Sequence, residues 1–299
     1  MKRYIIFILI FSAAASEAQQ LNSSSLHELQ GILHDPSVAG VQKNSMIGGS
    51  FRTQWNGMPG GPQTGLVFGS HFLEKIKLGL GGYLYSDVTG PTKRTGLEMA
   101  YAYHIPLRNN AHFSIGIEAR VQQFSYDKTK LMTSLGANDP VMAGDDKKVK
   151  GDAGIGASYT NEKFQVGVSV SQLIQSKLNF YNGSQSRTDQ AMLYRHYYVH
   201  GYYKWNVDDV ATVIPNFLMI YLPNAPLEFQ GGVRVEHREL FWWGVGARLK
   251  QSVMLSAGLR VKKNFLIGYA FDIYTTPLSV FDKGANAHEL LLTYEFSRK

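Results

Sequence analysis

The stretch F-R-T-Q-W-N-G-M-P-G-G-P-Q-T, residues 51–64, joins the end of one β-strand to the start of the next. Around its start, polar and nonpolar positions alternate as in a strand with one polar face: Ser50, Arg52 and Gln54 against Gly49, Phe51, Thr53 and Trp55. The turn contains residues that forbid a regular continuation: Gly57, Pro59, Gly60, Gly61 and Pro62. This stretch therefore predicts a strand, a Gly- and Pro-rich turn and a second strand.

Strand-like segments of about ten residues recur from Ile47 to the C-terminus, each bounded by turn residues. The alternation is clearest in residues 113–122, 164–171, 227–236, 252–261 and 289–296. About fourteen strands are predicted, and they begin near Ile47, Gln63, Lys77, Arg94, His112, Asp152, Phe164, Arg195, Ala211, Leu227, Leu240, Ser252, Phe265 and His288. The pattern predicts an all-β fold, a transmembrane outer-membrane β-barrel of antiparallel strands.

A soluble β-sandwich also alternates, so the composition of the polar faces has to separate the two folds. Solvent-exposed faces would be dense in Lys and Glu, whereas Gly, Ser and Gln dominate here, with occasional Arg and Glu, as in a crowded lumen. The chain contains 30 Gly, 17 Tyr, 16 Phe and 4 Trp, and only 18% of its residues are charged. These values favour a barrel wall with aromatic rims over a sandwich.

Residues 1–18 have the features of a secretory signal peptide. Lys2 and Arg3 form the charged head, an apolar run extends from Tyr4 to Phe11, and Ser16 and Ala18 make a small-x-small cleavage site. An uncleaved membrane anchor is the alternative, but the apolar run is too short to span a bilayer. We therefore expect an exported protein.

Residues 19–46 are polar and carry apolar residues at helical spacing, Leu26, Leu29, Ile32 and Leu33, before a stop at Asp35 and Pro36. They predict an N-terminal periplasmic segment or a short plug, and residues 47–299 predict the barrel. The chain has no Cys, so its stability does not depend on disulfides. The whole chain has 30 basic and 23 acidic residues, and removal of the signal residues Lys2, Arg3 and Glu17 leaves 28 and 22, a net charge of +6. The basic residues are scattered through strands and loops, which argues against a nucleic-acid partner.

The lengths of the connections predict the orientation of the barrel. An even number of strands places both termini on the periplasmic side, where the turns of bacterial barrels are short. The even-numbered connections are short, as at residues 161–163, 237–239 and 262–264, and the long ones are odd-numbered: Asp127 to Lys150, Ile174 to Tyr194 and Thr275 to Ala287. The turn at Lys250 and Gln251 departs from this rule. The Lys-rich run from Asp145 to Lys150 is interpreted as a solvated external loop, with contact to lipopolysaccharide phosphate as the alternative.

A search for catalytic and metal-binding patterns yields no site. No G-x-S-x-G motif occurs. His196 and His200 are four residues apart on a predicted strand, which separates them by roughly 13 Å, too far for one metal ion. Gly79, Gly81 and Gly82 lie inside a predicted strand and suit close packing or a bend, so they do not form a phosphate-binding loop. No enzyme activity and no cofactor are predicted.

Three blocks of sequence resemble the PorP/SprF family of outer-membrane proteins of the Bacteroidetes type IX secretion system. The first combines H-D-P-S-V-A-G (34–40) with R-T-Q-W-N-G-M-P-G-G-P-Q-T (52–64). The second combines D-V-T-G-P (87–91) with Y-A-Y-H-I-P-L (101–107), and the third G-Y-A-F-D (268–272) with H-E-L-L-L-T-Y-E-F (288–296). The resemblance extends over nearly the whole mature chain.

This resemblance implies a non-enzymatic outer-membrane component that serves the secretion or surface attachment of cargo with a C-terminal sorting domain, in some members adhesins used for gliding motility. The implied partners are other type IX components, such a cargo protein and outer-membrane lipid, with a peptidoglycan-associated periplasmic protein as a further candidate. The implied location is the outer membrane of a Gram-negative cell. An outer-membrane solute or lipid-molecule channel is the alternative, since it would have the same wall.

Two groups of residues are candidates for function. Eight charges are predicted to face the lumen, either as a salt-bridge network or as a docking surface: Arg52, Glu98, Glu118, Arg120, Arg234, Glu236, Arg248 and Arg260. The candidates for structural or partner contacts within the family blocks are Arg52, Gln54, Trp55, Gly57, Pro59, Gly60, Pro62, Asp87, Gly90, Pro91, His288 and Glu289. We expect Arg52 and Gln54 to point into the lumen, Trp55 to lie at the membrane interface, and the loop from Gly57 to Pro62 to fold inward, tethered by Arg52. The alternative for the loop is that these Gly and Pro residues only make a turn. His288 and Glu289 are interpreted as a structural pair at the start of a strand, with a catalytic dyad as the alternative.

Overall fold

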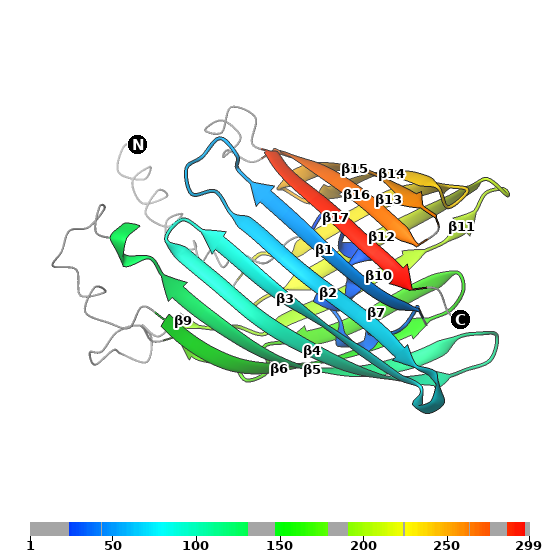
Figure 1. Cartoon of the computed structure of the whole chain (residues 1–299), viewed down its shortest axis with the longest axis horizontal. Helices are drawn as coiled ribbons and strands as arrows, with labels where there is room; N and C mark the ends of the chain where they lie inside the picture. Colours follow the sequence, from blue (N-terminus) through cyan, green and yellow to red (C-terminus); the bar gives the residue numbers. More distant parts are fainter. Residues whose placement is uncertain are drawn as a thin grey trace, which may run out of the picture.

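A computed structural model of the chain describes residues 24–42, 44–130, 147–178, 191–223, 225–262, 264–275 and 286–296. Fourteen antiparallel strands close into a barrel (Figure 1). They are β1 (Ser45–Gln54), β2 (Gln63–Leu73), β3 (Leu78–Thr89), β4 (Thr92–Pro106), β5 (His112–Tyr126), β6 (Lys147–Thr160), β7 (Phe164–Ser171), β10 (His196–Tyr203), β12 (Ala211–Tyr221), β13 (Glu228–His237), β14 (Phe241–Arg248), β15 (Ser252–Val261), β16 (Phe265–Tyr274) and β17 (Asn286–Phe296). The predicted signal peptide and the middles of the three predicted long connections lie outside the described residues.

The barrel is closed by the pairing of its first strand with its last. β1 pairs with β17, and Arg52 lies opposite Glu289 in that register. On the far side of the wall β10 pairs with β12. A two-residue strand, β11 (Trp205–Asn206), pairs with β12, and β8 (Lys177–Leu178) with β9 (Ala191–Met192) forms a separate ribbon. The predicted barrel, its strand number and the order of its strands are thus confirmed.

The two faces of the wall differ as the two-residue period predicts. Large apolar side chains project outward and are exposed, as expected of a surface that faces lipid: Ile47, Phe51, Val67, Leu84, Leu97, Ile117, Val121, Val168, Val245, Leu255 and Leu290. Polar and charged side chains project inward and are buried, among them Arg52, Glu98 and Arg248. Within the described residues, no helix has the length and apolar character needed to cross a bilayer.

The two ends of the barrel differ in the length of their connections. At the end where β1 begins and β17 ends, the turns are short, and two of them contain pairs of residues with left-handed backbone, Asn109 with Asn110 and Arg238 with Glu239. At the same end the N–H groups of Val210 and Ala211 donate to Asp208 and lower the pKa of its carboxyl. Because bacterial barrels have short periplasmic turns, we assign this end to the periplasm.

The opposite, external end carries the longer connections. The turn between β14 and β15 is short, as the sequence indicated, and Lys250 adopts a left-handed backbone there. The β3–β4 turn, Gly90 and Pro91, is a second short connection at this end, which the sequence analysis did not single out. A one-turn 3-10 helix, η4 (Glu74–Ile76), makes the β2–β3 connection at the periplasmic end.

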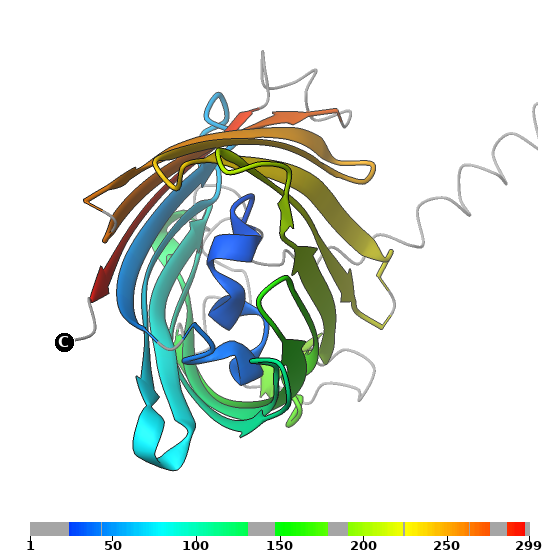
Figure 2. The same ribbon diagram turned by 90° about the vertical axis from the view of Figure 1, so that its right-hand side faces the viewer.

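Residues 24–42 lie inside the barrel, as the view along the barrel axis from the periplasmic end shows (Figure 2). We call this segment the plug. It contains three one-turn 3-10 helices, η1 (His27–Leu29), η2 (Gly31–Leu33) and η3 (Pro36–Val38). Pro36 opens η3, and the Asp35 side chain caps it by accepting the N–H of Ser37 at 2.8 Å. The plug begins beside the external half of β17, where Ser24 contacts Glu289, and leads to the periplasmic start of β1.

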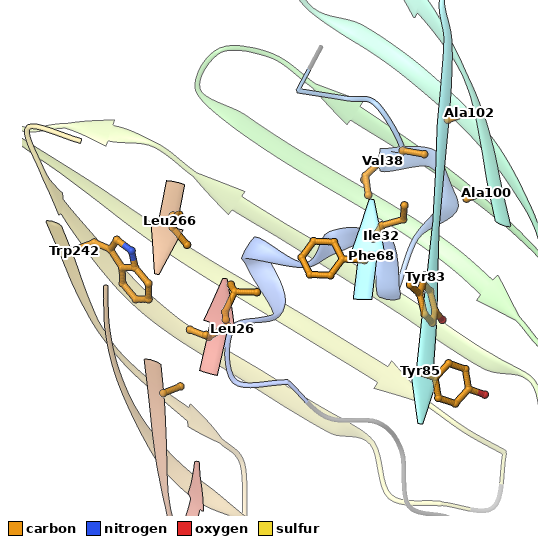
Figure 3. Close-up of a cluster of buried hydrophobic side chains, with 13 residues drawn as sticks. Leu26, Ile32, Val38, Phe68, Tyr83, Tyr85, Ala100, Ala102, Trp242 and Leu266 are labelled. Atoms are coloured by element: carbon orange, nitrogen blue, oxygen red, sulfur yellow. The ribbon is translucent and has the colours of Figure 1, made fainter. Parts of the chain in front are cut away.

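The hydrophobic core of the protein lies between the plug and the wall (Figure 3). It contains four buried plug side chains, Leu26, Ile32, Val38 and Ala39, and wall residues that include Phe68, Tyr83, Tyr85, Trp242 and Leu266. Leu29 and Leu33 pack against this cluster. The apolar residues at helical spacing therefore make the contacts of a core, although the backbone forms three 3-10 turns.

Glycines in the wall allow the plug backbone to approach closely. A β-carbon at Gly79 would collide with the carbonyl oxygen of Ala39, and one at Gly81 would collide with Ile32. The same holds at Gly116, which faces Ser37, and at Gly156, which faces Asp35. The predicted close packing of Gly79 and Gly81 is confirmed, with the plug as the neighbour.

Candidate functional site

Arg52 is the centre of a buried polar cluster at the seam of the barrel. Its side chain projects inward from β1 and is 3% exposed. Nη2 donates to Oδ2 of Asp272 on β16 at 2.6 Å, and Nη1 donates to Oε2 of Glu289 on β17 at 3.2 Å. Nη1 also donates to the Ser25 hydroxyl of the plug at 2.9 Å. One guanidinium thus connects the first strand, the last two strands and the plug.

The carboxylates of this cluster hold the start of the plug. Glu289 accepts the Ser24 hydroxyl at 2.6 Å, the Ser25 backbone N–H at 2.8 Å and the Gln30 amide at 2.9 Å. Asp272 accepts the Ser25 hydroxyl at 2.6 Å. Hydrogen bonds to a carboxylate are stronger than those between neutral groups, so this end of the plug is firmly attached.

Arg248 extends the cluster across the wall. Its Nη2 donates to Oε1 of Gln230 at 2.9 Å, and its Nε lies 3.3 Å from Glu228 Oε1. The Gln230 amide donates in turn to the carbonyl oxygen of Ser24 at 2.9 Å and contacts Nδ1 of His27 at 2.8 Å. Gln230 therefore links Arg248 to the plug through hydrogen bonds.

Arg234 makes a separate ion pair with the plug. Its Nε donates to Glu28 Oε1 at 2.6 Å, and its Nη1 pairs with Glu236 on the same strand. The guanidinium also lies over the ring of Trp242, 5.6 Å from its centroid. A plug carboxylate and an aromatic ring thus both contact this charge.

The second half of the plug is attached to the opposite wall. Asp35 Oδ2 lies 2.9 Å from Nε2 of His200 on β10, and Ser37 donates to Ser158 at 2.8 Å. Nε2 of His104 lies 2.8 Å from the carbonyl oxygen of Ala39. The plug is therefore held from both sides of the lumen.

A further network lies within the wall. Arg120 pairs with Glu98 and, at 3.1 Å, with Glu118. Tyr83 donates to Glu98 at 2.6 Å, and Ser171 donates to Glu118 at 2.6 Å. The predicted lumen charges all face inward and all form ion pairs: Arg52, Glu98, Glu118, Arg120, Arg234, Glu236, Arg248 and Arg260. The salt-bridge reading of these residues agrees with the geometry.

The plug separates two spaces in the lumen. A cavity of about 710 Å³ lies between the plug and the periplasmic turns, lined by Glu28, Gln42 and Glu239 among others. A smaller chamber of about 70 Å³ lies on the external side, between Arg52, Arg94 and Tyr198. The plug, with its attached side chains, lies between them.

The external rim brings together the loops of two family blocks. The Gly90 N–H donates to the carbonyl oxygen of Gly60 at 2.9 Å, and both glycines have positive φ, +56° and +81°. An added side chain would be strained at either position. Gly57 and Pro59 are exposed, whereas Pro62 is buried and its carbonyl accepts the N–H of Gln54 at 2.9 Å.

The remaining candidates on the rim make specific contacts. The Gln54 side chain points inward, as predicted, and its Oε1 accepts the hydroxyl of Tyr274 at 2.6 Å. Asp87 accepts the hydroxyl of Thr64 at 2.7 Å and lies 3.9 Å from Arg94. Pro91 follows Gly90 in the β3–β4 turn, and its carbonyl accepts the N–H of Asp127 at 2.8 Å.

Two of the expectations for this region are wrong. Trp55 packs against Tyr274 and Ala287 with its Nε1 buried, where we expected a hydrated N–H at the membrane interface. Its left-handed backbone, with φ of +54°, ends the strand alternation and turns the ring toward the barrel mouth. Arg52 does not tether the Gly57–Pro62 loop, because its hydrogen bonds go to Ser25, Asp272 and Glu289.

His288 and Glu289 project from opposite faces of β17. His288 lies on the outer face, with Nδ1 2.6 Å from the Tyr269 hydroxyl, and Glu289 points into the lumen. Their side chains therefore cannot act as a dyad. His200, which is too far from His196 to share a metal ion, is the hydrogen-bonding partner of Asp35. Among the described residues, no group of three or more His, Asp or Glu side chains could hold a metal ion.

Sequence reasoning missed four carboxylates that pair with cationic or histidine side chains in the lumen: Glu28, Asp35, Glu228 and Asp272. Asp272 lies on the inward positions of β16 with Leu266 and Ala270, so a carboxylate in an otherwise apolar row was the available signal. Glu28 and Asp35 gave no such signal, because the strand period does not extend into the plug. Their partners lie 206 and 165 residues away in the chain.

Comparisons with known proteins identify the family of this chain. Residues 15–294 match the family of the type IX secretion system membrane protein PorP/SprF. The chain belongs to the PorP/SprF family. Membership of this family implies that the PorP/SprF protein has a role in type IX secretion at the outer membrane. A search of curated proteins finds no match.

Solved structures of outer-membrane barrels share the fold of this PorP/SprF chain. The Ralstonia pickettii toluene transporter TbuX has a TM-score of 0.55 at 10% identity, covering 89% of this chain and 93% of that one. The CymD monoaromatic hydrocarbon channel has a TM-score of 0.54 at 10% identity, covering 90% and 93%. A Pseudomonas aeruginosa FadL homologue has a TM-score of 0.52 at 10% identity, covering 88% and 93%. At this identity the likeness concerns the fold alone.

Proposed function

We propose that the protein is a non-enzymatic outer-membrane component of the type IX secretion system. It serves the secretion or surface attachment of a cargo protein with a C-terminal sorting domain, gliding adhesins among the candidates. Its contact surface for the cargo or the translocon is the external rim formed by the loops around Gly60 and Gly90.

The observation that carries this role is that the first family block contacts both of the others. Gly60 of the first block meets Gly90 of the second, and Arg52 of the first block is held by Asp272 and Glu289 of the third. Arg52 thus joins chain segments more than 200 residues apart at the seam of the barrel, close to its external end. The filled lumen also favours a docking role over an open channel, because the plug lies between the two spaces.

The test is deletion of the gene, followed by measurement of the surface display of sorting-domain proteins and of small-solute uptake. We expect the loss of one cargo protein from the cell surface or the medium, with solute uptake unchanged. Normal display combined with an uptake defect would reject this role and support the alternative, a solute or lipid-molecule channel.

The rim is tested by complementing the deletion with the double variant Gly60→Ala, Gly90→Ala. Both substitutions strain a left-handed backbone at the loop contact, so cargo display should fall while the barrel remains heat-modifiable on gels. Gly151→Ala is the matched control, because a β-carbon there has only the Arg120 carbonyl oxygen within 4 Å, at 3.9 Å. Full display by the double variant would exclude the rim as the contact surface.

A further inference from the structure

A row of polar side chains crosses the outer face of the barrel near its external end. Lys93 on β4 lies opposite Ser125 on β5, and Ser125 lies opposite Lys147 on β6. Lys93 and Lys147 are both exposed, and the Ser125 hydroxyl donates to the carbonyl oxygen of Lys93 at 3.3 Å. Two lysines therefore stand on the lipid-facing side, two strands apart, which is about 10 Å between their Cα atoms.

The row directly below these lysines is polar, Thr95 opposite Gln123, and the rows beneath it are apolar. The outward side chains of β4 and β5 pair from Ile105 with Phe113, at the periplasmic end, up to Leu97 with Val121. These rows extend about 27 Å along the strand, or about 20 Å in height at a tilt near 40°, close to the apolar band of about 25 Å expected of such barrels. Lys93 lies four residues beyond Leu97, about 10 Å higher by the same geometry. This height is that of the headgroups, above the hydrocarbon.

Basic residues gather at this part of the external end. The described external ends of β4, β5 and β6 and the turn after β5 carry six lysines: Lys93, Lys128, Lys130, Lys147, Lys148 and Lys150. By contrast, Lys250 is the single lysine at the external ends of β12 to β17 within the described part of the chain. Most of the described lysines at the external end therefore lie on this side of the barrel.

We propose that Lys93 and Lys147 form a binding surface for a phosphate group of an outer-leaflet lipid. An ammonium group is a compact charge with three donors, and a lysine stem can lie along apolar surface while its head reaches a phosphate. At their separation both lysines reach the same headgroup, with the Ser125 hydroxyl between them. The acyl chains of that lipid lie against Leu97 and Val121, which are 41% and 54% exposed. This surface faces lipid and lies beside the proposed rim, since Lys93 follows Gly90 by three residues.

The experiment measures the binding of lipid A, a glycolipid with two phosphates, to the purified full-length protein by native mass spectrometry. The variant is Lys93→Gln, Lys147→Gln. Each lysine near a lipid phosphate contributes electrostatic attraction, and we expect the double variant to bind lipid A about tenfold more weakly than the natural chain. Lys93→Arg, Lys147→Arg keeps both charges and should retain the affinity of the natural chain.

The matched control is Lys75→Gln, Lys163→Gln, which removes the same charge at exposed periplasmic positions. It should bind lipid A as the natural chain does. Equal affinity for the natural chain and the Lys93, Lys147 Gln variant would overturn the proposal, and so would an equal loss in the control pair. A second probe, lipid A from which both phosphates have been removed, should bind the natural chain and the Gln variant alike; a remaining tenfold difference would show that the phosphate is not the group recognised.

Discussion

Arg52 and Glu289 lie directly opposite each other across the seam between the first and the last strand, with Nη1 and Oε2 3.2 Å apart. A slip of one residue in this register would turn Glu289 toward lipid. Arg52 would then lie opposite Leu290 or His288, depending on the direction of the slip. Both outcomes place a charge where no partner exists. The pair therefore selects one register at the seam.

Replacing Arg52 should destabilise the barrel strongly. Arg52→Ala leaves Asp272 and Glu289 buried with fewer compensating charges, and breaking a buried ion pair in this way costs about 3–5 kcal/mol. We expect the heat-modifiable form to be lost at a clearly lower temperature on gels. Arg260→Ala is the control, since its pair with Glu295 is 22% and 24% exposed and is worth less than about 1 kcal/mol.

A compensating variant separates charge from packing at the same place. Arg52→Met combined with Asp272→Asn and Glu289→Gln removes the cation and both carboxylate charges, so it should unfold at a higher temperature than Arg52→Ala. If Arg52→Ala and Arg260→Ala shift the unfolding temperature equally, Arg52 does not have the structural role assigned to it.

A side chain at Gly156 should displace the plug. A β-carbon there collides with Asp35, so Gly156→Leu is expected to expel the residues around η3. The chain has no Cys, and Ser37→Cys therefore provides a single reporter at a fully buried plug position. We expect a membrane-impermeant maleimide to label it slowly in the otherwise natural chain and quickly with Gly156→Leu.

Gly151→Leu on the same strand is the control for this experiment, because its side chain would point away from the plug. It should leave the labelling of the Ser37 reporter slow. Fast labelling of the natural background would mean that the plug does not occupy the lumen as described.

The assigned orientation is tested with single cysteines in two connections. Met58→Cys lies in the β1–β2 loop and should react with an impermeant maleimide on intact cells. Lys163→Cys lies in the β6–β7 turn and should react only after the outer membrane is permeabilised. The opposite pattern would invert the barrel, and with it the assignment of the rim as external.

Removal of the plug should open the barrel. The plug lies between the two lumen spaces, so deletion of residues 24–42 is expected to produce steady ion conductance in planar bilayers, with little conductance from the full-length protein. Heat-modifiable migration of the deletion variant is the check that its barrel is folded. A folded deletion variant without conductance would show that side chains of the wall alone close the lumen.

The wall could be predicted from the sequence, because the strand period is local. Alternation assigns each residue to one face, so the inward position of Arg52, Glu98 and Arg248 followed from the pattern, and the predicted strand starts lie close to those observed. The period also indicated that charges would meet in the lumen. It could not show which of them pair, because that depends on the stagger between strands.

The plug and the external rim could be predicted only in part. Spacing indicated that Leu26 and Ile32 share a face, but their neighbours Trp242 and Phe68 lie far away in the chain. The position of Trp55 was wrong because one residue with left-handed backbone reverses the direction of a side chain. In a residue other than Gly or Asn, the sequence pattern does not indicate a left-handed backbone.

The contacts of the plug also place it in the order of folding. Ser24 is near the start of the chain, yet its partner Glu289 is 265 residues away on the last strand to be synthesised. The plug can make all its hydrogen bonds only after β17 has joined β1, since Glu289 and Arg52 come together at that step. The earliest part of the chain is thus the last to reach its final contacts, and a barrel that lacks its final strand leaves the Ser24 end of the plug without its anchor.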